Sequence, residues 1–193
     1  DLFDNGAPEK TALVRQLDEE VNRAHTGIKL FIAEVNRGSL SEEEARRGIE
    51  LTDFAINLEH AGDIISKTLM PLAEEKSAKR LQFSSAGWSE MTAIHARVLA
   101  NLQLALNVLL SGDLASARQL VKEKELMRHL ERDSHDRHLG RLQSGEVVSI
   151  ETSNMHLEIV RALKEINSLL ATVAYPILRD SGDLLESRLA QSA

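Results

Sequence analysis

An apolar pattern occurs twice in this chain, with the two copies 105 residues apart. In each copy, mostly apolar residues recur at alternating intervals of four and three, and a proline stands one position before the last of them. The two sets are Phe54, Leu58, Ala61, Ile65, Thr68 and Leu72, with Pro71, and Ile159, Leu163, Ile166, Leu170, Val173 and Ile177, with Pro176. This spacing is typical of the seam along which helices pack. We therefore predict an internal duplication in which these two helices correspond.

The composition favours an all-α fold. The chain has 193 residues and is 42% hydrophobic, and most of its apolar residues are aliphatic rather than aromatic. Ten glycines and three prolines are too few for a turn-rich β protein, and 27% of the residues are charged and interleaved with aliphatic ones, as in amphipathic helices. A chain of this length can bury roughly 70% of its unfolded surface in a single domain.

Charge and cysteine content exclude several classes of function. Because the chain has no cysteine, it has no disulfides, thiolate metal sites or cysteine nucleophiles. The net charge of −7 repels phosphate backbones, so we predict no nucleic-acid partner. The longest uncharged run, Val98 to Gly112, has 15 residues, whereas a membrane span needs about 20. We therefore expect a soluble fragment without a transmembrane segment, and interpret the start at Asp1 as a cut from a longer protein.

Capping residues and periodicity predict five long helices. The first runs from Pro8 to Gly38, and the second from Ser41 to Leu81 with a kink at Pro71. The third follows a break at Ser84–Gly87 and ends at Gly112, and the fourth runs from Asp113 to about Gly145. The fifth begins between Ser149 and Ser153 and ends at about Arg179. Along the third helix, we expect one buried face, made of Met91, Ile94, Val98, Leu102, Leu106 and Leu109. A short turn over Leu184 to Ala190 is expected to follow.

Long helices with short connections favour an antiparallel, up-and-down bundle. We predict one domain over residues 1–193 with two pseudo-repeats of three helices each, over about 8–81 and 85–180, and a tail over 181–193. The order of the helices then implies that the first helix of the first repeat is missing or truncated.

Two carboxylates stand on one face of the first seam helix. Glu59 and Asp63 are four residues apart, so that one hard cation could bridge them. A glycine between them, Gly62, suggests that another helix or a ligand approaches the backbone there. The alternative is that both acids are solvated flank residues, paired with Lys67 or Arg47.

The run Leu58-Glu59-His60-Ala61-Gly62-Asp63 resembles the Leu-Glu-Arg-Ile-Gly-Asp signature of the PhoU-like phosphate-regulatory family. The segments 151–158, 163–168 and 174–178 resemble the PhoU-like region that follows the membrane domain in bacterial sodium/phosphate cotransporter-related proteins. The resemblance extends over residues 9 to 180. It implies two three-helix repeats, each with an acidic helix that holds iron or another metal in some members.

The resemblance places a metal site on Glu59 and Asp63, with Asp18 of the first helix as a third ligand. Oxygen ligands of this kind suit a divalent metal or iron. The corresponding residues of the second repeat are Lys164 and Ser168, which cannot form a carboxylate cluster. We therefore expect at most one metal site, in the first repeat.

The histidines do not form a catalytic pattern. His129, His135 and His138 lie in a charge-dense run that reads as a solvated helix face. We expect the others to be partly buried edge residues: His25, His60, His95 and His156. No Glu-x-x-His, His-Glu-x-x-His, Gly-x-Ser-x-Gly or phosphate-binding glycine loop is present, so we predict that the chain is not an enzyme.

The resemblance implies a regulatory domain on the cytoplasmic face of the cell membrane. It would belong to a sodium-dependent phosphate transporter, bind the transporter domain in cis or a second copy of itself, and modulate phosphate uptake by protein contact. A stand-alone PhoU-type regulator of a transporter complex or a sensor kinase is the first alternative. The others are a metal-dependent enzyme that uses Glu59, Asp63 and Asp18, and an adaptor bundle unrelated to phosphate.

Overall fold

The computed structural model describes residues 3 and 8–183, so the turn expected over Leu184 to Ala190 lies outside the described residues. This part of the chain consists of helices and their connections and contains no β-strand, which confirms the all-α prediction. The elements are α2 (Pro8–Val35), α3 (Glu42–Ile64), the π-helix η1 (Ile65–Leu69), α4 (Met70–Ala78), α5 (Ser85–Ser111), α6 (Leu114–Gln143), α7 (Val147–Glu151), α8 (Ser153–Leu170), the 3₁₀-helix η2 (Ala171–Val173) and α9 (Ala174–Asp180).

The helix ends follow from local capping chemistry. Ser41 forms the predicted capping box, in which its hydroxyl accepts from the Glu44 backbone N–H while the Glu44 carboxylate accepts from the Ser41 backbone N–H. Asp113 caps α6 by accepting from the backbone N–H of Ser116. Gly112 ends α5 with a φ of 64°, a left-handed conformation that favours glycine.

The duplicated helices are distorted at corresponding places. The first changes from α to π geometry over Ile65–Leu69 and the second to 3₁₀ geometry over Ala171–Val173, in both cases just before the seam proline. Proline lacks an N–H and its ring clashes with the preceding turn, which accounts for the break. The last long helix, α8, begins at Ser153, within the expected range, and the short helix α7 precedes it with only a turn at Thr152 between them.

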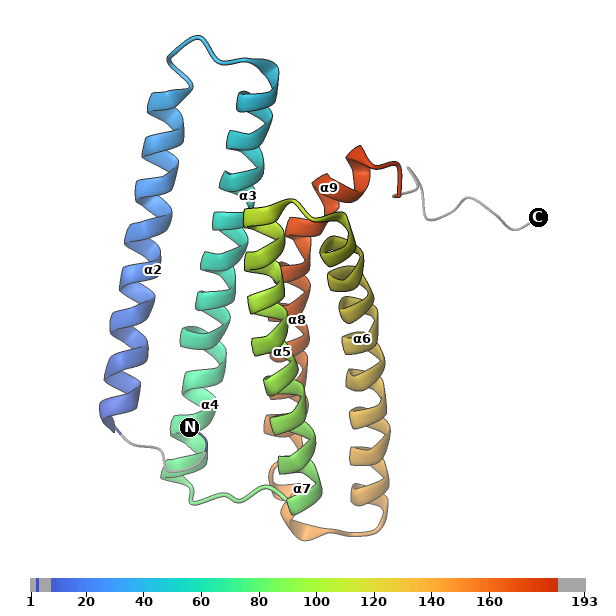
Figure 1. Ribbon diagram of the computed structural model, residues 1–193. Coiled ribbons are helices and arrows are strands. Elements are labelled where there is room, and N and C mark those ends of the chain that lie inside the picture. Colours follow the sequence, from blue (N-terminus) through green and yellow to red (C-terminus); the bar gives the residue numbers. More distant parts are fainter. Residues whose placement is uncertain (1–2, 4–7, 184–193) are drawn as a thin grey trace, which may run out of the picture.

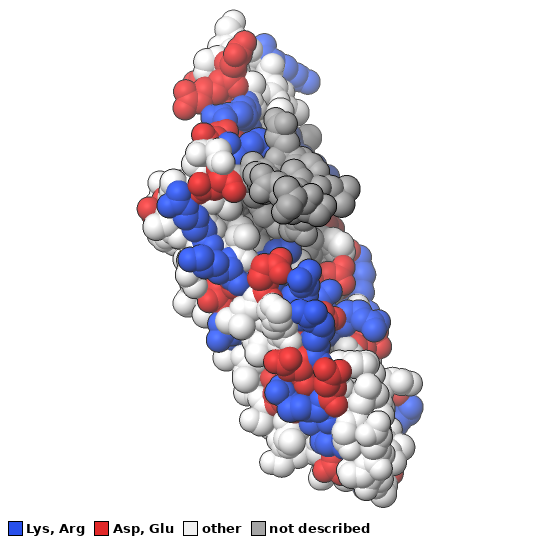
Figure 2. Space-filling view, turned by 90° about the vertical axis from the view of Figure 1, so that its right-hand side faces the viewer, with Lys and Arg blue, Asp and Glu red and all other residues white. Residues whose placement is uncertain are grey.

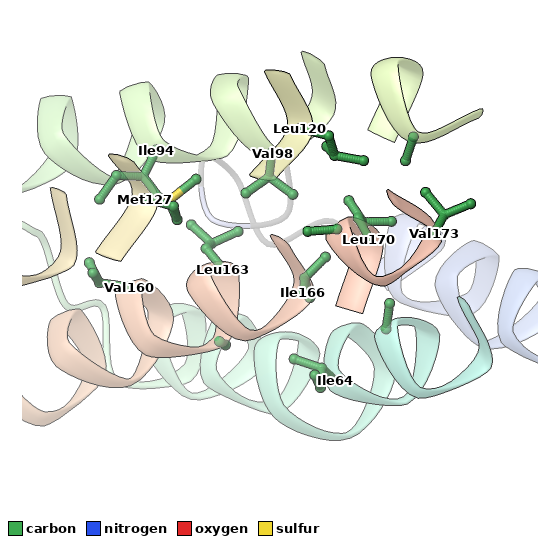
Figure 3. Close-up of a cluster of buried hydrophobic side chains, with 14 of the residues drawn as sticks. Ile64, Ile94, Val98, Leu120, Met127, Val160, Leu163, Ile166, Leu170 and Val173 are labelled. Atoms are coloured by element: carbon green, nitrogen blue, oxygen red, sulfur yellow. The ribbon is translucent and has the colours of Figure 1, made fainter. Parts of the chain in front are cut away.

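Three helices of the second repeat form a bundle, and the first repeat packs against one side of it. In Figure 1, α5, α6 and α8 lie together, α3 lies beside α8, and α2 lies at the edge of the molecule against α3. The hairpin of α2 and α3 extends past the end of α5. Figure 3 shows the core where these helices meet; its labelled residues are Ile64, Ile94, Val98, Leu120, Met127, Val160, Leu163, Ile166, Leu170 and Val173.

The buried face of α5 differs from the expected one beyond Val98. Asn101, Ala105 and Val108 continue it into the bundle, whereas Leu106 is exposed, and Leu102 and Leu109 are only partly buried. The pattern of aliphatic residues predicted that the leucines would be buried. Asn101 is buried in their place, and its side chain donates a hydrogen bond to the Asn167 side chain on α8, at 2.7 Å. The leucines instead form a second apolar stripe along α5.

This double stripe makes α5 apolar enough, by length and composition, to cross a membrane, with a mean hydropathy of 1.4. The length of the uncharged run, 15 residues, therefore underestimated how long the apolar part of this helix is. Of the described helices it alone passes this test. In the fold, α5 packs against α6 and α8.

Charged side chains of both signs cover the face that includes α6 and α9. Figure 2 shows Lys and Arg side chains interleaved with Asp and Glu side chains over this face. Some are paired between elements: Arg97 of α5 with Glu123 of α6, and Arg118 of α6 with Asp183, which follows α9, each at 2.6 Å. Ion pairs that are this exposed to solvent add little to stability.

Candidate functional site

The predicted acidic residues lie where α2 meets α3. The Ser66 hydroxyl donates to Asp18 Oδ1 at 3.0 Å, and the Lys67 ammonium lies 2.6 Å from Asp63 Oδ1. The hydrogen bond with Asp63 raises the pKa of Lys67; burial opposes this effect, and the charges of Asp63, Asp18 and Glu59 add to it. Asp18 and Asp63 are thus brought together, and Glu59 lies one helical turn before Asp63.

These residues do not form a ready metal cage. The Lys67 ammonium already supplies the positive charge next to Asp63, and the described part of the chain contains no group of three or more His, Asp or Glu side chains placed to share an ion. This geometry favours the alternative in which Asp63 pairs with Lys67. A metal on Glu59, Asp63 and Asp18 therefore stays a prediction from resemblance.

The glycine beside these acids is not required by close packing. A Cβ atom on Gly62 would lie 3.7 Å from Asp18 Oδ1 and 3.7 Å from Val21 Cγ1, which is ordinary contact. The corresponding second-repeat residue is the fully buried Asn167. Gly62 instead lines an apolar groove along α3.

The second repeat carries basic groups in the corresponding region. Lys164 lies 3.6 Å from Glu131 of α6, and the Ser168 hydroxyl donates to the Lys164 carbonyl within its own helix. Lys124 of α6 donates to the Tyr175 hydroxyl at 2.6 Å and stands over the tyrosine ring. At the positions of Glu59 and Asp63, the second repeat thus has a lysine that pairs with Glu131 and a serine that bonds within its own helix.

A buried polar cluster, which the sequence did not reveal, joins α5, α6 and α8. Glu90 of α5 accepts hydrogen bonds from Ser134 at 2.8 Å, Arg137 at 3.0 Å and Arg141 at 2.8 Å, all on α6. Ser134 Oγ also lies 3.2 Å from Nε2 of His156 on α8. We call Glu90, Ser134, His138, Arg141 and His156 the Glu90 cluster.

The environment of the Glu90 cluster keeps its histidines neutral. Burial, and then the charges of the neighbouring His138 and Arg141, together lower the pKa of His156 to about 4, although Glu90 acts in the opposite direction. Burial likewise lowers the pKa of His138. Burial raises the pKa of Glu90, but the hydrogen bonds from Arg141 and Ser134, with the charges of Arg141 and Arg137, outweigh burial and hold it below its usual range.

Two expectations for histidines were therefore wrong. His138 is not on the solvated face of α6, and His156 is not at an edge, because both rings are buried between α6 and α8. Among the other expected edge residues, His25 is half-buried, whereas His60 and His95 are exposed. Spacing held a signal for His138: Leu120, Met127, Ser134 and His138 follow intervals of seven, seven and four along the buried face of α6.

Several surfaces expose apolar side chains, and two of them involve both α2 and α3. The first is a groove of about 1110 Å³ between α2, α3, α5 and α8, which includes Leu17, Leu58, Leu99 and Leu163. The second is the far end of the α2–α3 hairpin, where Leu30 and Phe31 are 68% and 66% exposed. Large apolar side chains left in the open are typical of surfaces that contact another protein or segment.

The chain is similar to proteins described as a "putative inorganic phosphate export protein YjbB". It is 40% identical to the one from Salmonella typhimurium and 38% identical to the one from Escherichia coli K12, in each case over 174 residues. The matched region is 90% of this chain and 32% of each relative, so the chain spans about a third of the length of these curated proteins. No protein-family model matches the chain.

The fold is similar to a solved structure, the crystal structure of PhoU from Pseudomonas aeruginosa. The TM-score is 0.78 at 17% sequence identity, and the match covers 90% of this chain and 82% of that one. This likeness shows the fold without the function. The chain is therefore an all-α bundle with the PhoU fold, homologous over most of its length to part of proteins described as "putative inorganic phosphate export" proteins.

Proposed function

We propose that this chain is a regulatory domain of a phosphate transport protein, acting by contact with the transporter domain of the same polypeptide. The observation that carries the proposal is the 40% identity over 174 residues to a protein described as a phosphate exporter, of which the chain matches only about a third. The remaining two thirds of such a relative is long enough to hold a transporter domain. The finer parts of this proposal are that transport is coupled to sodium, that the domain lies on the cytoplasmic face of the membrane, and that it modulates phosphate uptake.

A domain of this kind regulates only if it binds one transport state more tightly than another. Phe31 and Leu30 give the α2–α3 hairpin an apolar end with which to make such a contact.

The test uses the full-length protein in cells or in vesicles, with phosphate flux as the measurement. Removal of residues 8–180 is expected to change the flux, or to abolish its response to phosphate supply, at an unchanged level of protein in the membrane. Phe31→Ser is expected to reproduce part of the change, whereas Lys29→Ser, at an exposed position on the same helix, leaves the flux as it is.

Other outcomes of these experiments would favour one of the alternative functions. Unchanged flux and response after removal of the domain would favour an adaptor unrelated to phosphate. Restoration by the domain supplied as a separate chain would favour a stand-alone regulator. Phosphatase turnover by the purified chain that Asp63→Ala abolishes would favour the metal-dependent enzyme. Flux that depends on the sodium gradient would support a sodium-coupled transporter.

A further inference from the structure

The short helix α7 exposes a compact apolar surface at one end of the molecule. Val147 is 64% exposed, Ile150 is 52% exposed and Val148 is 38% exposed, and all three belong to this helix of five residues. We call these three residues the α7 patch. In Figure 1, α7 lies at the end of the bundle opposite to the connection between α2 and α3. Apolar side chains gathered in the open are typical of a surface that another molecule covers.

Buried polar side chains hold α7 so that the patch points outward. Ser149, in the middle of the helix, is 2% exposed; its hydroxyl donates to Glu146 at 2.5 Å and lies 3.2 Å from the Ser84 hydroxyl. Thr152, directly after the helix, is also 2% exposed, and its hydroxyl donates to the Val148 carbonyl at 2.8 Å. The side of α7 that faces the protein is therefore polar and the side that faces solvent is apolar, which is the reverse of an ordinary surface helix.

The first repeat shows that the fold does not require apolar residues at this place. With the 105-residue offset of the duplicated seam, Val147 and Val148 correspond to Glu42 and Glu43. Both glutamates are exposed in the first turn of α3, just as the two valines begin α7. Because the same position accepts charged residues, local structure does not account for the apolar side chains of the α7 patch.

The charges around the α7 patch nearly cancel. Arg80 lies in the connection that leads to α5, and Glu151 ends α7; both are exposed, and neither side chain forms an ion pair with another residue in the part of the chain that the structure describes. The third charge near the patch, Glu146, faces Arg141 at 3.9 Å. The chain as a whole carries −7, so that an anionic lipid surface repels most of the molecule. The end that carries α7 is one at which this repulsion is small.

We propose that the α7 patch rests on the surface of a lipid bilayer. Val147, Val148 and Ile150 then lie at the boundary between headgroups and acyl chains, and Arg80 lies at the level of the lipid phosphates. The contact rests on the proposed function, because three apolar side chains bind a bilayer only weakly and need a second anchor, which a transporter domain in the same polypeptide would supply. It orients the domain against the membrane and so determines which of its other faces reach the transporter domain.

The first test places a fluorescent probe on the α7 patch of the full-length protein in membranes. The 193 residues contain no cysteine, so Val147→Cys gives a single labelling site once any cysteine elsewhere in the full-length protein is replaced. Lipids with a nitroxide on the acyl chain near the headgroup are expected to remove about half of the fluorescence of a nitrobenzoxadiazole label there.

Leu110→Cys is the matched control. Leu110 is 85% exposed, more than Val147, but it lies in the last turn of α5, roughly 40 Å along this helix from the end that α7 contacts. A probe on Leu110→Cys is expected to keep its fluorescence in the same membranes. Quenching at Val147→Cys alone therefore reports contact with lipid rather than exposure.

Each other outcome overturns the proposal. An unquenched probe on Val147→Cys with the same emission as in residues 1–193 in solution would show that the patch stays in water. An unquenched probe with a blue-shifted emission would assign the patch to a protein partner. Full-length protein that does not fractionate with membranes would overturn both this contact and the proposed function. Quenching in a protein whose phosphate flux ignores the domain would overturn the proposed function alone.

The second test asks whether the patch itself makes the contact. Val147→Asp with Ile150→Asp adds two charges that a bilayer disfavours, at side chains that face solvent in the folded chain. In this variant a probe on Val148→Cys is expected to lose its quenching by nitroxide lipid, whereas Leu106→Asp with Leu110→Asp, at exposed positions of α5, leaves the quenching unchanged. Equal thermal unfolding of the two variants shows that both are folded. Quenching that survives Val147→Asp with Ile150→Asp would contradict a contact through the α7 patch.

Discussion

The imidazole rings of His138 and His156 are stacked, with their centroids 4.7 Å apart and their planes within 9° of parallel. His138 belongs to α6 and His156 to α8, so the stacked pair joins these two helices inside the second repeat. The His138 Nε2 lies 2.8 Å from the Ser153 hydroxyl, and the His156 Nε2 lies 3.2 Å from that of Ser134. The pair is compatible with burial only while both rings are neutral.

Acid is expected to destabilise the protein through His156. Its pKa is about 4 in the folded chain and near 6.5 in the unfolded chain, so the unfolded state binds more protons between these values. Stability is therefore full above about pH 6.5 and decreases as the pH falls toward 4, by roughly 3 kcal/mol at most for this group. Urea unfolding at a series of pH values measures the effect.

The matched variants separate this effect from general acid unfolding. His156→Gln is expected to flatten the dependence of the unfolding free energy on pH between 4 and 6.5, even if the variant is less stable at pH 7. His60→Gln removes an exposed histidine from α3 and is expected to keep the original slope. Identical slopes for the parent protein and His156→Gln would contradict the assignment.

The stacked pair also explains a glycine in α5. A Cβ atom on Gly87 would lie 3.3 Å from Nδ1 of His156 and 3.1 Å from the capping hydroxyl of Ser84. Because stacking holds the imidazole, Gly87→Ala is expected to lower the unfolding free energy by about 1–2 kcal/mol. Gly140→Ala has open space around its new methyl group and is expected to stabilise α6 by about 0.5–1 kcal/mol. Chemical denaturation distinguishes the two, and a stabilising Gly87→Ala would contradict the tight packing.

The buried amide pair of α5 and α8 is expected to behave as one unit. Asn101 donates to the Asn167 side-chain oxygen, so Asn101→Ala leaves a buried acceptor unpaired and is expected to cost about 2 kcal/mol. Replacing both residues with leucine removes the polar groups together and is expected to cost less than the sum of the single changes. A double-mutant cycle from urea unfolding measures the coupling, and strictly additive losses would disprove it.

Lys67 is expected to control cation binding at the acidic residues. Its ammonium lies 2.6 Å from Asp63, so Lys67→Ala is expected to raise the affinity of the chain for Mn²⁺ about tenfold, because two carboxylates then lack a counter-charge. Addition of Asp63→Ala is expected to abolish the gain. Isothermal titration of the metal-free protein gives the affinities. Stoichiometric binding by the parent chain that Asp63→Ala removes would instead support the site predicted on Glu59, Asp63 and Asp18.

The sequence by itself determined the order of the helices and where most of them end. Ser41, Asp113 and Gly112 act through the hydrogen bonds and backbone angles of their immediate neighbours, so their roles could be deduced without tertiary information. The duplication was also readable, because a seam repeated at a fixed distance keeps its spacing in the chain and its proline breaks both copies at the same point.

Only the tertiary structure decided which of the neighbouring stripes became buried and which charges met. Asn101 and His138 are polar residues, and their burial depends on partners 66 residues away for Asn101 and on another helix for His138. The pairing of Asp63 with Lys67 was one of two readings of the sequence, and the geometry at Asp63 favours it over a cage of three ligands. Periodicity records which side chains share a helix face, but the partner across that face is set by packing, which brings together residues that are distant in the chain.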